Sequence, residues 1–112
     1  MKNKILNIIE IIKESGKLII VEGKNDKKAL NELGLKNIIT LSKEPLFSIV
    51  EQIDDKEVII LTDFDKEGKK LYQSLKHDLQ EKGVKIDDKL RRILSKSKIT
   101  HIEGLTKYLN KT

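Results

Sequence analysis

The chain has 112 residues, of which 37% are charged and 38% are hydrophobic, and its formal net charge is +5 at pH 7. This length is enough for one hydrophobic core but not for two. Disulfide bonds and thiolate metal sites are excluded, because the sequence contains no cysteine. We expect a cytoplasmic protein without a membrane partner, because no signal-peptide pattern and no run near the ~18 apolar residues of a membrane span is present.

The sequence alternates amphipathic helical patterns with short apolar runs. Isoleucines at positions 5, 8, 9 and 12 share one helical face, and Gly16 is expected to end that helix. Asn25 is expected to cap the second helix, and Pro45 suits the first turn of the third. In chain order, the pattern predicts a helix over 3–14, a strand over 17–23, a helix over 26–33, a strand over 37–41, a helix after residue 45, a strand over 57–62, a helix over 67–83, a short strand over 84–86, and helices over 87–96 and 103–110.

Strands separated by helices of this length predict parallel pairing through right-handed crossovers. We therefore expect an α/β fold with a mainly parallel sheet of about four strands. The almost wholly apolar strand over 57–62 is expected to be central, with both faces covered. Residues 1–112 are read as a single domain, with the motif-bearing core over 17–86 and a helical segment over 87–112.

Acidic residues follow two of the predicted strands. Glu22 and Gly23 end the first strand, and Asp63 and Asp65 follow the third in the stretch IILTDFDKEG. Ligands bind at the carboxyl ends of strands in open α/β sheets. Ionised carboxylates about 5 Å apart repel by about 3 kcal/mol per pair, whereas a helix N-terminus offsets about 0.3–1 kcal/mol. The cluster therefore favours a bound proton or a divalent cation, and an all-oxygen ligand set favours Mg²⁺ or Mn²⁺ over zinc.

Structural explanations stay open beside the functional ones. Asp63 and Asp65 are also typical turn and cap residues, and Glu67 fits an outer metal ligand or a first-turn helix acid. Gly23 and Gly68 permit close approach of a phosphate or of another backbone segment. Four nearby lysines fit either phosphate contacts or solvent exposure: Lys24, Lys27, Lys66 and Lys69.

Two further features are weaker candidates. The segment KLRRILSKSK at 89–98 has five basic residues and no acidic one, so Arg91 and Arg92 are candidate contacts to nucleic acid. Its aliphatic residues share a face that should turn Arg92 to solvent and leave Arg91 nearer the boundary, and a solvated helix surface explains the pattern equally well. His77 and His101 have no partner at ligand spacing, and we expect both at the surface.

The two acidic motifs, VEGKND and TDFDKEG, together resemble the Toprim domain that topoisomerases, bacterial primases and a ribosomal RNA maturation nuclease share. The resemblance covers about residues 17–86, and over its whole length the chain is similar to small stand-alone archaeal Toprim proteins. It implies a three-layer α/β/α fold in which Glu22 is a general acid or base and Asp63, Asp65 and Glu22 bind Mg²⁺ or Mn²⁺. Asp26 fits a motif variant of the primases and the maturation nuclease and is read as a supporting residue.

The resemblance implies Mg²⁺-dependent phosphodiester chemistry on RNA or DNA, of nuclease type. The alternative is a non-catalytic module that binds nucleic acid or a partner protein. Compared with the topoisomerase motif, Phe64 replaces a proline and Lys69 replaces a glutamate. We expect neither the tyrosine-bearing domain of a topoisomerase nor the template-binding region of a primase in this chain. The amphipathic N-terminal helix is compatible with a homodimer.

Overall fold

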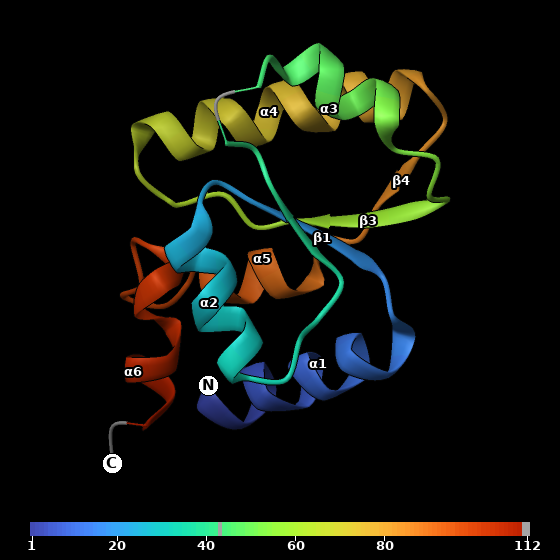
Figure 1. The fold of residues 1–112 in the computed structure, drawn as a ribbon. Helices are drawn as coiled ribbons and strands as arrows, with labels where there is room; N and C mark the ends of the chain where they lie inside the picture. Colours follow the sequence, from blue (N-terminus) through green and yellow to red (C-terminus); the bar gives the residue numbers. More distant parts are fainter. Residues whose placement is uncertain (43, 111–112) are drawn as a thin grey trace.

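The short apolar runs of the sequence form the strands of the sheet. In the computed structural model, which describes residues 1–42 and 44–110, these residues form a four-stranded parallel sheet in the order β2-β1-β3-β4 (Figure 1). The strands are β1 (Leu18–Val21), β2 (Ile38–Thr40), β3 (Glu57–Ile60) and β4 (Lys85–Ile86). β1 and β3 are the central pair, and Ile20 of β1 pairs with Ile60 of β3. The predicted α/β fold with a central third strand is confirmed.

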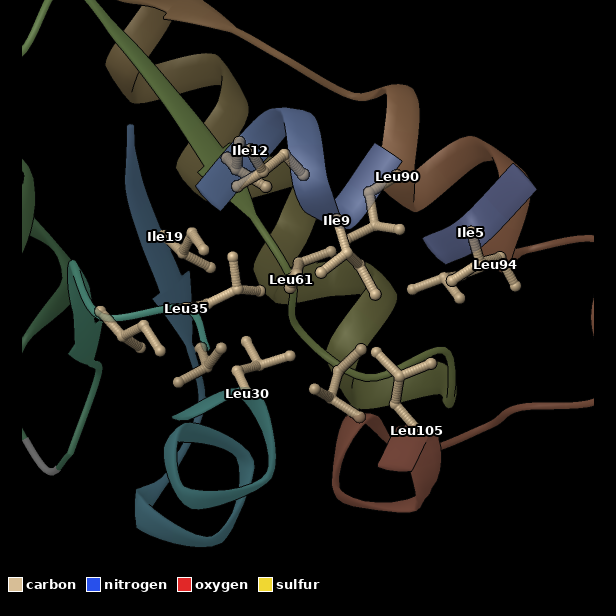
Figure 2. Packing of buried hydrophobic residues seen from close by; sticks show 14 residues of the cluster. Ile5, Ile9, Ile12, Ile19, Leu30, Leu35, Leu61, Leu90, Leu94 and Leu105 are labelled. Carbon is tan, nitrogen blue, oxygen red and sulfur yellow. The ribbon is translucent and has the colours of Figure 1, made fainter. Parts of the chain in front are cut away.

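One face of the sheet is covered by the N-terminal and C-terminal helices. This layer contains α1 (Lys2–Ser15), α2 (Lys24–Glu32), α5 (Lys89–Leu94), a short 3-10 helix η1 (Ile102–Gly104) and α6 (Leu105–Asn110) (Figure 1). The side chains of Ile19 and Leu61 point into it. Figure 2 shows Ile5, Ile9 and Ile12 of α1 directed into the same cluster, which also holds Leu90 and Leu94 of α5. The isoleucine pattern is therefore the core face of α1.

The opposite face carries α3 (Leu46–Gln52) and α4 (Lys66–Glu81). Ile20 and Ile60 point to this side, because successive side chains of a strand face opposite ways. They pack with Leu75 and Leu79 of α4, and each of these four side chains is at most 1% exposed. Burial of such a side chain contributes about 1.5–3 kcal/mol. Helices on both faces complete the expected three layers. Within residues 1–42 and 44–110, no helix combines the length and hydropathy that crossing a bilayer requires.

Helix ends follow the predicted signals at Gly16 but not at Asn25. Gly16 adopts the left-handed conformation (φ 68°) that ends α1. α2 begins at Lys24 with Gly23 as its N-cap, and the carboxylate of Asp26 accepts the Gly23 N–H at 3.0 Å. The expectation of an Asn25 cap was wrong, because an acidic residue at the third helical position reaches back to the same turn. Pro45 is the N-cap of α3 and precedes its first turn.

Lys17 ties the start of β1 to two neighbouring acids. Its ammonium lies 2.9 Å from Asp87 Oδ2 and 3.1 Å from Glu57 Oε1. The hydrogen bond to Asp87 raises the pKa of Lys17 against the opposing effect of burial. Burial acts to raise the pKa of Asp87, but hydrogen bonds from Lys17 and from the Lys89 N–H outweigh it, and the pKa is lowered.

The Lys17–Asp87 pair should stabilise the fold within a defined pH window. The lowered pKa of Asp87 contributes stability above its unfolded value near 3.8, and this stability is lost as the pH falls through the folded value. The raised pKa of Lys17 contributes stability that is fully present below 10.5 and is lost as the pH rises through its folded value. Asp87→Asn should therefore lower the free energy of unfolding by about 1 kcal/mol at pH 7, and by progressively less as the pH falls below 3.8.

Urea denaturation at several pH values measures this difference. The control is Asp54→Asn, because the side chain of Asp54 is 96% exposed and lies 3.9 Å from Lys82 Nζ. That control should leave stability nearly unchanged at every pH. An equal loss for Asp87→Asn at pH 3 and pH 7 would contradict an electrostatic origin.

Candidate functional site

Glu22 and Asp63 meet where β1 and β3 end. Because Ile20 pairs with Ile60, the residues that follow the two strands emerge at the same edge of the sheet. The main-chain N–H of Asp63 donates to Glu22 Oε2 at 2.7 Å. Burial raises the pKa of Glu22; the Asp63 N–H opposes this effect, and the nearby carboxylates of Asp63 and Asp65 add to it. Glu22, Asp63 and Asp65 from the two sequence motifs thus lie together at one edge of the sheet, which we call the acidic edge.

The two carboxylate oxygens of Asp65 have different surroundings. Oδ1 accepts the Gly68 N–H at 2.7 Å and caps α4. Oδ2 lies 3.5 Å from His101 Nε2, and the Asp65 side chain is 42% exposed. Oδ1 therefore has the helix-capping role that the sequence suggests for Asp65, and Oδ2 is positioned to bind a ligand.

Gly68 and Gly23 differ in what their missing side chains permit. A Cβ at Gly68 would lie 2.1 Å from the carbonyl oxygen of Asp63, so this position admits only glycine without a backbone shift. Thr62 Oγ1 also donates to the Gly68 carbonyl at 2.7 Å and holds the loop against α4. At Gly23, no described atom lies within 4 Å of an added Cβ. Gly68 therefore serves backbone packing, whereas the space beside Gly23 is open to a ligand.

Arg91 packs against the loop over residues 61–65, which we call the acidic loop, and it is 7% exposed. Its guanidinium donates to the main-chain carbonyls of Thr62 at 2.7 Å and Asp63 at 3.2 Å. The rings of Phe64 and Tyr72 flank it at 4.6 Å and 4.2 Å. This placement corrects the expectation that Arg91 contacts nucleic acid, because its donors are engaged inside the protein. Burial lowers the pKa of Arg91, and electrostatic interactions with Tyr72, Asp63 and Glu22 oppose that effect.

His101 is exposed, as expected, but it also belongs to the acidic edge, which corrects the expectation that it has no partner at ligand spacing. The Thr100 carbonyl accepts the Phe64 N–H at 2.7 Å, and the Ile102 N–H donates to Asp63 Oδ1 at 2.8 Å. One ligand atom each from Asp63, Asp65 and His101 lie within 4.8 Å of one another. Sequence reasoning missed this residue because long-range packing, not local spacing, brings it to the loop. His77 is exposed on α4 and lies 3.0 Å from Glu81, as expected of a surface residue.

The predicted phosphate-contact lysines lie around this edge. Lys24 and Lys66 are the exposed first residues of α2 and α4, Lys69 is exposed on the first turns of α4, and Lys27 is half-buried. Helix N-termini carry partial positive charge, so both helix starts add to the attraction for an anion. Glu67 is an exposed acid in the first turn of α4.

Two other predicted residues lie on α2 and α5. Asp26 is buried, and its bond to Gly23 fixes the turn that follows Glu22. Burial raises the pKa of Asp26, and the Gly23 N–H opposes this effect. Arg92 is 69% exposed and pairs with Asp88 at 3.1 Å.

The donor set at this edge fits a divalent metal ion. Asp63 and Asp65 offer carboxylate oxygens, which suit Mg²⁺ and Mn²⁺, and His101 adds a nitrogen that the all-oxygen expectation lacked. Glu22 stands beside this set, with Oε2 engaged by the Asp63 N–H. The positive charge of Arg91 offsets part of the repulsion among the acids, because it bonds to the backbone of the same loop.

Substitution of Asp65 should separate its cap role from its charge. Asn keeps a side-chain oxygen for the Gly68 N–H, so Asp65→Asn should retain the metal-free stability within about 0.5 kcal/mol. Asp65→Ala removes the cap and should lose about 1 kcal/mol. Chemical denaturation in the presence of EDTA measures both values. Equal losses in the two variants would show that the charge, and not the cap, stabilises the start of α4.

Comparison with known proteins assigns the family. The model of the Toprim domain matches residues 16–88. A UPF0292 protein of Methanocaldococcus jannaschii is 38% identical over 117 residues, covering 96% of this chain and 91% of the relative. A UPF0292 protein of Pyrococcus abyssi is 39% identical over 103 residues, covering 88% of this chain and 78% of the relative. A solved protein structure from Aquifex aeolicus matches with a TM-score of 0.80 at 34% identity, covering 90% of this chain and 94% of that one. The chain therefore belongs to the Toprim domain family, and its relatives include the archaeal UPF0292 proteins.

Proposed function

We propose that this Toprim protein is a divalent-metal-dependent nuclease that cleaves phosphodiester bonds of structured RNA. Membership of the Toprim family supports metal binding and a function related to nucleic acid. The observation that carries the finer proposal is the meeting of Asp63 and Asp65 with the half-buried Glu22 at one edge of the sheet. The VEGKND motif resembles that of the primases and of the ribosomal RNA maturation nuclease, and the second resemblance is the reason for choosing RNA in this proposal.

Each acidic residue has a distinct task in this proposal. Asp63 and Asp65 hold the ion, which when bound shields the charge on phosphate and orients the attacking or leaving oxygen. Glu22 moves the proton as general acid or base, and its raised pKa suits that task because burial weakens its preference for the ionised form. The Asp63 N–H fixes Glu22 Oε2 and so orients the carboxylate.

The surroundings of the acidic edge suit a nucleic-acid strand. Lys24, Lys66 and Lys69 are exposed there, and they fit contacts to phosphates on either side of the scissile bond. A hollow of about 470 Å³ adjoins His101 and is lined among others by Lys98, Glu103, Lys107 and Tyr108. The two lysines of this hollow fit a phosphate, whereas Tyr108 is half-buried and Lys2 Nζ lies over its ring, 5.6 Å from the centre.

Cleavage assays on end-labelled nucleic acids test the proposal. A structured RNA, a single-stranded RNA and a DNA duplex are incubated with Mg²⁺, Mn²⁺ or EDTA. The wild type should cleave structured RNA only with a metal ion. Asp63→Asn should abolish cleavage because the ion loses the negative charge of one ligand, and Glu22→Gln should slow cleavage by about 10²–10⁴-fold because proton transfer is lost.

Thermal melting of the same proteins separates ion binding from catalysis. An ion that binds only the native state raises the melting temperature, and at 100 times its Kd it stabilises by about 2.7 kcal/mol. Wild type and Glu22→Gln should show this rise, whereas Asp63→Asn should not. A wild type that binds the ion but cleaves no member of the panel would overturn the nuclease proposal.

A basic groove between α1 and α5 favours a second candidate function, a non-catalytic module that binds nucleic acid. This groove has a volume of about 580 Å³, and its described lining contains Lys4, Lys89, Arg92 and Lys96 but no acidic residue. Ile8 and Ile93 also line it. Clustered cations at such a groove fit a polyanion backbone, and this binding requires no metal ion.

The salt dependence of binding tests whether the basic groove contacts nucleic acid. The double change Arg92→Gln and Lys96→Gln should lower the slope of log affinity against log salt by about 0.7–0.9 for each lost contact. A matched double change at the acidic edge, Lys24→Gln and Lys66→Gln, gives the comparison. Fluorescence anisotropy with labelled RNA at several salt concentrations measures both. An unchanged slope for the first pair with a lowered slope for the second would exclude the groove.

A further inference from the structure

The backbone on both sides of His101 is bonded to the acidic loop. On one side, the Thr100 carbonyl accepts the Phe64 N–H at 2.7 Å. On the other side, the Ile102 N–H donates to Asp63 Oδ1 at 2.8 Å, and the Ile102 side chain is fully buried. The imidazole therefore projects from a segment held at two adjacent points, and its position beside Asp65 follows from the fold.

The distances around His101 fit ligands that share one ion. Ligands about 2.1 Å from an ion lie about 3 Å apart at a right angle and about 4.2 Å apart when opposite. His101 Nε2 and Asp65 Oδ2 are 3.5 Å apart, which lies between these two distances. The ligand atoms of Asp63, Asp65 and His101 all lie within 4.8 Å of one another, so a side-chain shift of about 0.6 Å at most brings the widest pair within reach of one ion. A direct charge-assisted hydrogen bond is shorter, at about 2.7–2.9 Å.

The nitrogen of His101 changes which ions the site prefers. Mg²⁺ takes oxygen ligands almost exclusively. Mn²⁺ also takes carboxylate oxygens, but it belongs to the first-row transition ions, which accept nitrogen ligands such as imidazole with affinities that follow the Irving–Williams order. The side chains of His101 and Asp65 are 54% and 42% exposed, so an ion reaches both from solvent. We propose that His101 is a nitrogen ligand of the ion held by Asp63 and Asp65, and that it makes the site selective for Mn²⁺ over Mg²⁺.

This inference rests on the metal site of the proposed function, and it adds a ligand from outside the matched Toprim region. Two readouts test it without measuring catalysis. Calorimetric titration of metal-stripped protein gives the affinities for Mn²⁺ and Mg²⁺, and pulsed electron paramagnetic resonance of bound Mn²⁺ detects a directly coordinated nitrogen.

Three variants provide the comparison. His101→Ala should weaken Mn²⁺ binding about tenfold or more, change Mg²⁺ binding much less, and remove the nitrogen signal. His101→Asp restores an all-oxygen set and should shift the ratio of the two affinities toward Mg²⁺. His77→Ala is the matched control, because His77 is also an exposed histidine paired with an acid, and it should change neither readout.

The outcomes distinguish this inference from the proposed function. Metal binding that requires Asp63 but shows no nitrogen signal, or the same ratio of affinities in wild type, His101→Ala and His101→Asp, would overturn the role of His101 and leave the carboxylate site intact. A wild type that binds neither ion would overturn both. A nitrogen signal that is lost in His101→Ala and kept in His77→Ala supports the ligand role.

Discussion

The contact of Arg91 with the loop after β3 is the interaction on which the acidic edge depends. Parallel pairing of β1 and β3 forces the residues that follow both strands to one edge, and these residues include three acids. Like charges drive such a loop apart, and its buried carbonyls need donors that α4 does not supply. The guanidinium of Arg91 satisfies both requirements, because it donates to the Thr62 and Asp63 carbonyls and carries a positive charge. The aromatic rings of Phe64 and Tyr72 keep it in that position.

The part of the site that the sequence predicts is the part that depends on strand ends. Glu22 and Asp63 follow nearly continuous apolar runs, which indicate central strands, and parallel pairing of adjacent strands is enough to bring them together. The fold is predictable for the same reason, since the helical and strand periods along the chain are clear and Gly16 marks the end of α1 as expected. The helical spacing of Ile5, Ile9 and Ile12 indicates a core-facing surface even when the elements that pack against it are not known.

Arg91 and His101 were beyond sequence reasoning because their roles depend on how α5 and the segment before η1 pack on the sheet. Arg91 lies in a basic run, and such a run indicates a solvated surface unless a buried acceptor faces it. Here the acceptors are main-chain carbonyls, which no residue pattern reveals. Asn25 was misread for a local reason: two polar residues near a helix start compete to cap it, and the carboxylate of Asp26 makes the bond.

The arrangement also separates two contributions to the site. The region that matches the Toprim domain supplies the carboxylates, while Arg91 and His101 come from the chain that follows it. The contact between Ile102 and Asp63 Oδ1 joins the two parts directly. A C-terminal segment in this position thus completes an acidic edge that the matched region begins.

The capping bond of Asp65 has a consequence for how quickly the proposed metal site would exchange a bound ion. Because Oδ1 is already fixed by the first turn of α4, the side chain keeps its rotamer through a bond that needs no metal. Binding of a metal ion would then order little of the chain, and the main free-energy cost would be the removal of water from the incoming ion. For the divalent ion proposed above, dehydration rather than folding would therefore set the rate of association. A site built this way would follow the free concentration of the proposed ion without unfolding between one occupancy and the next.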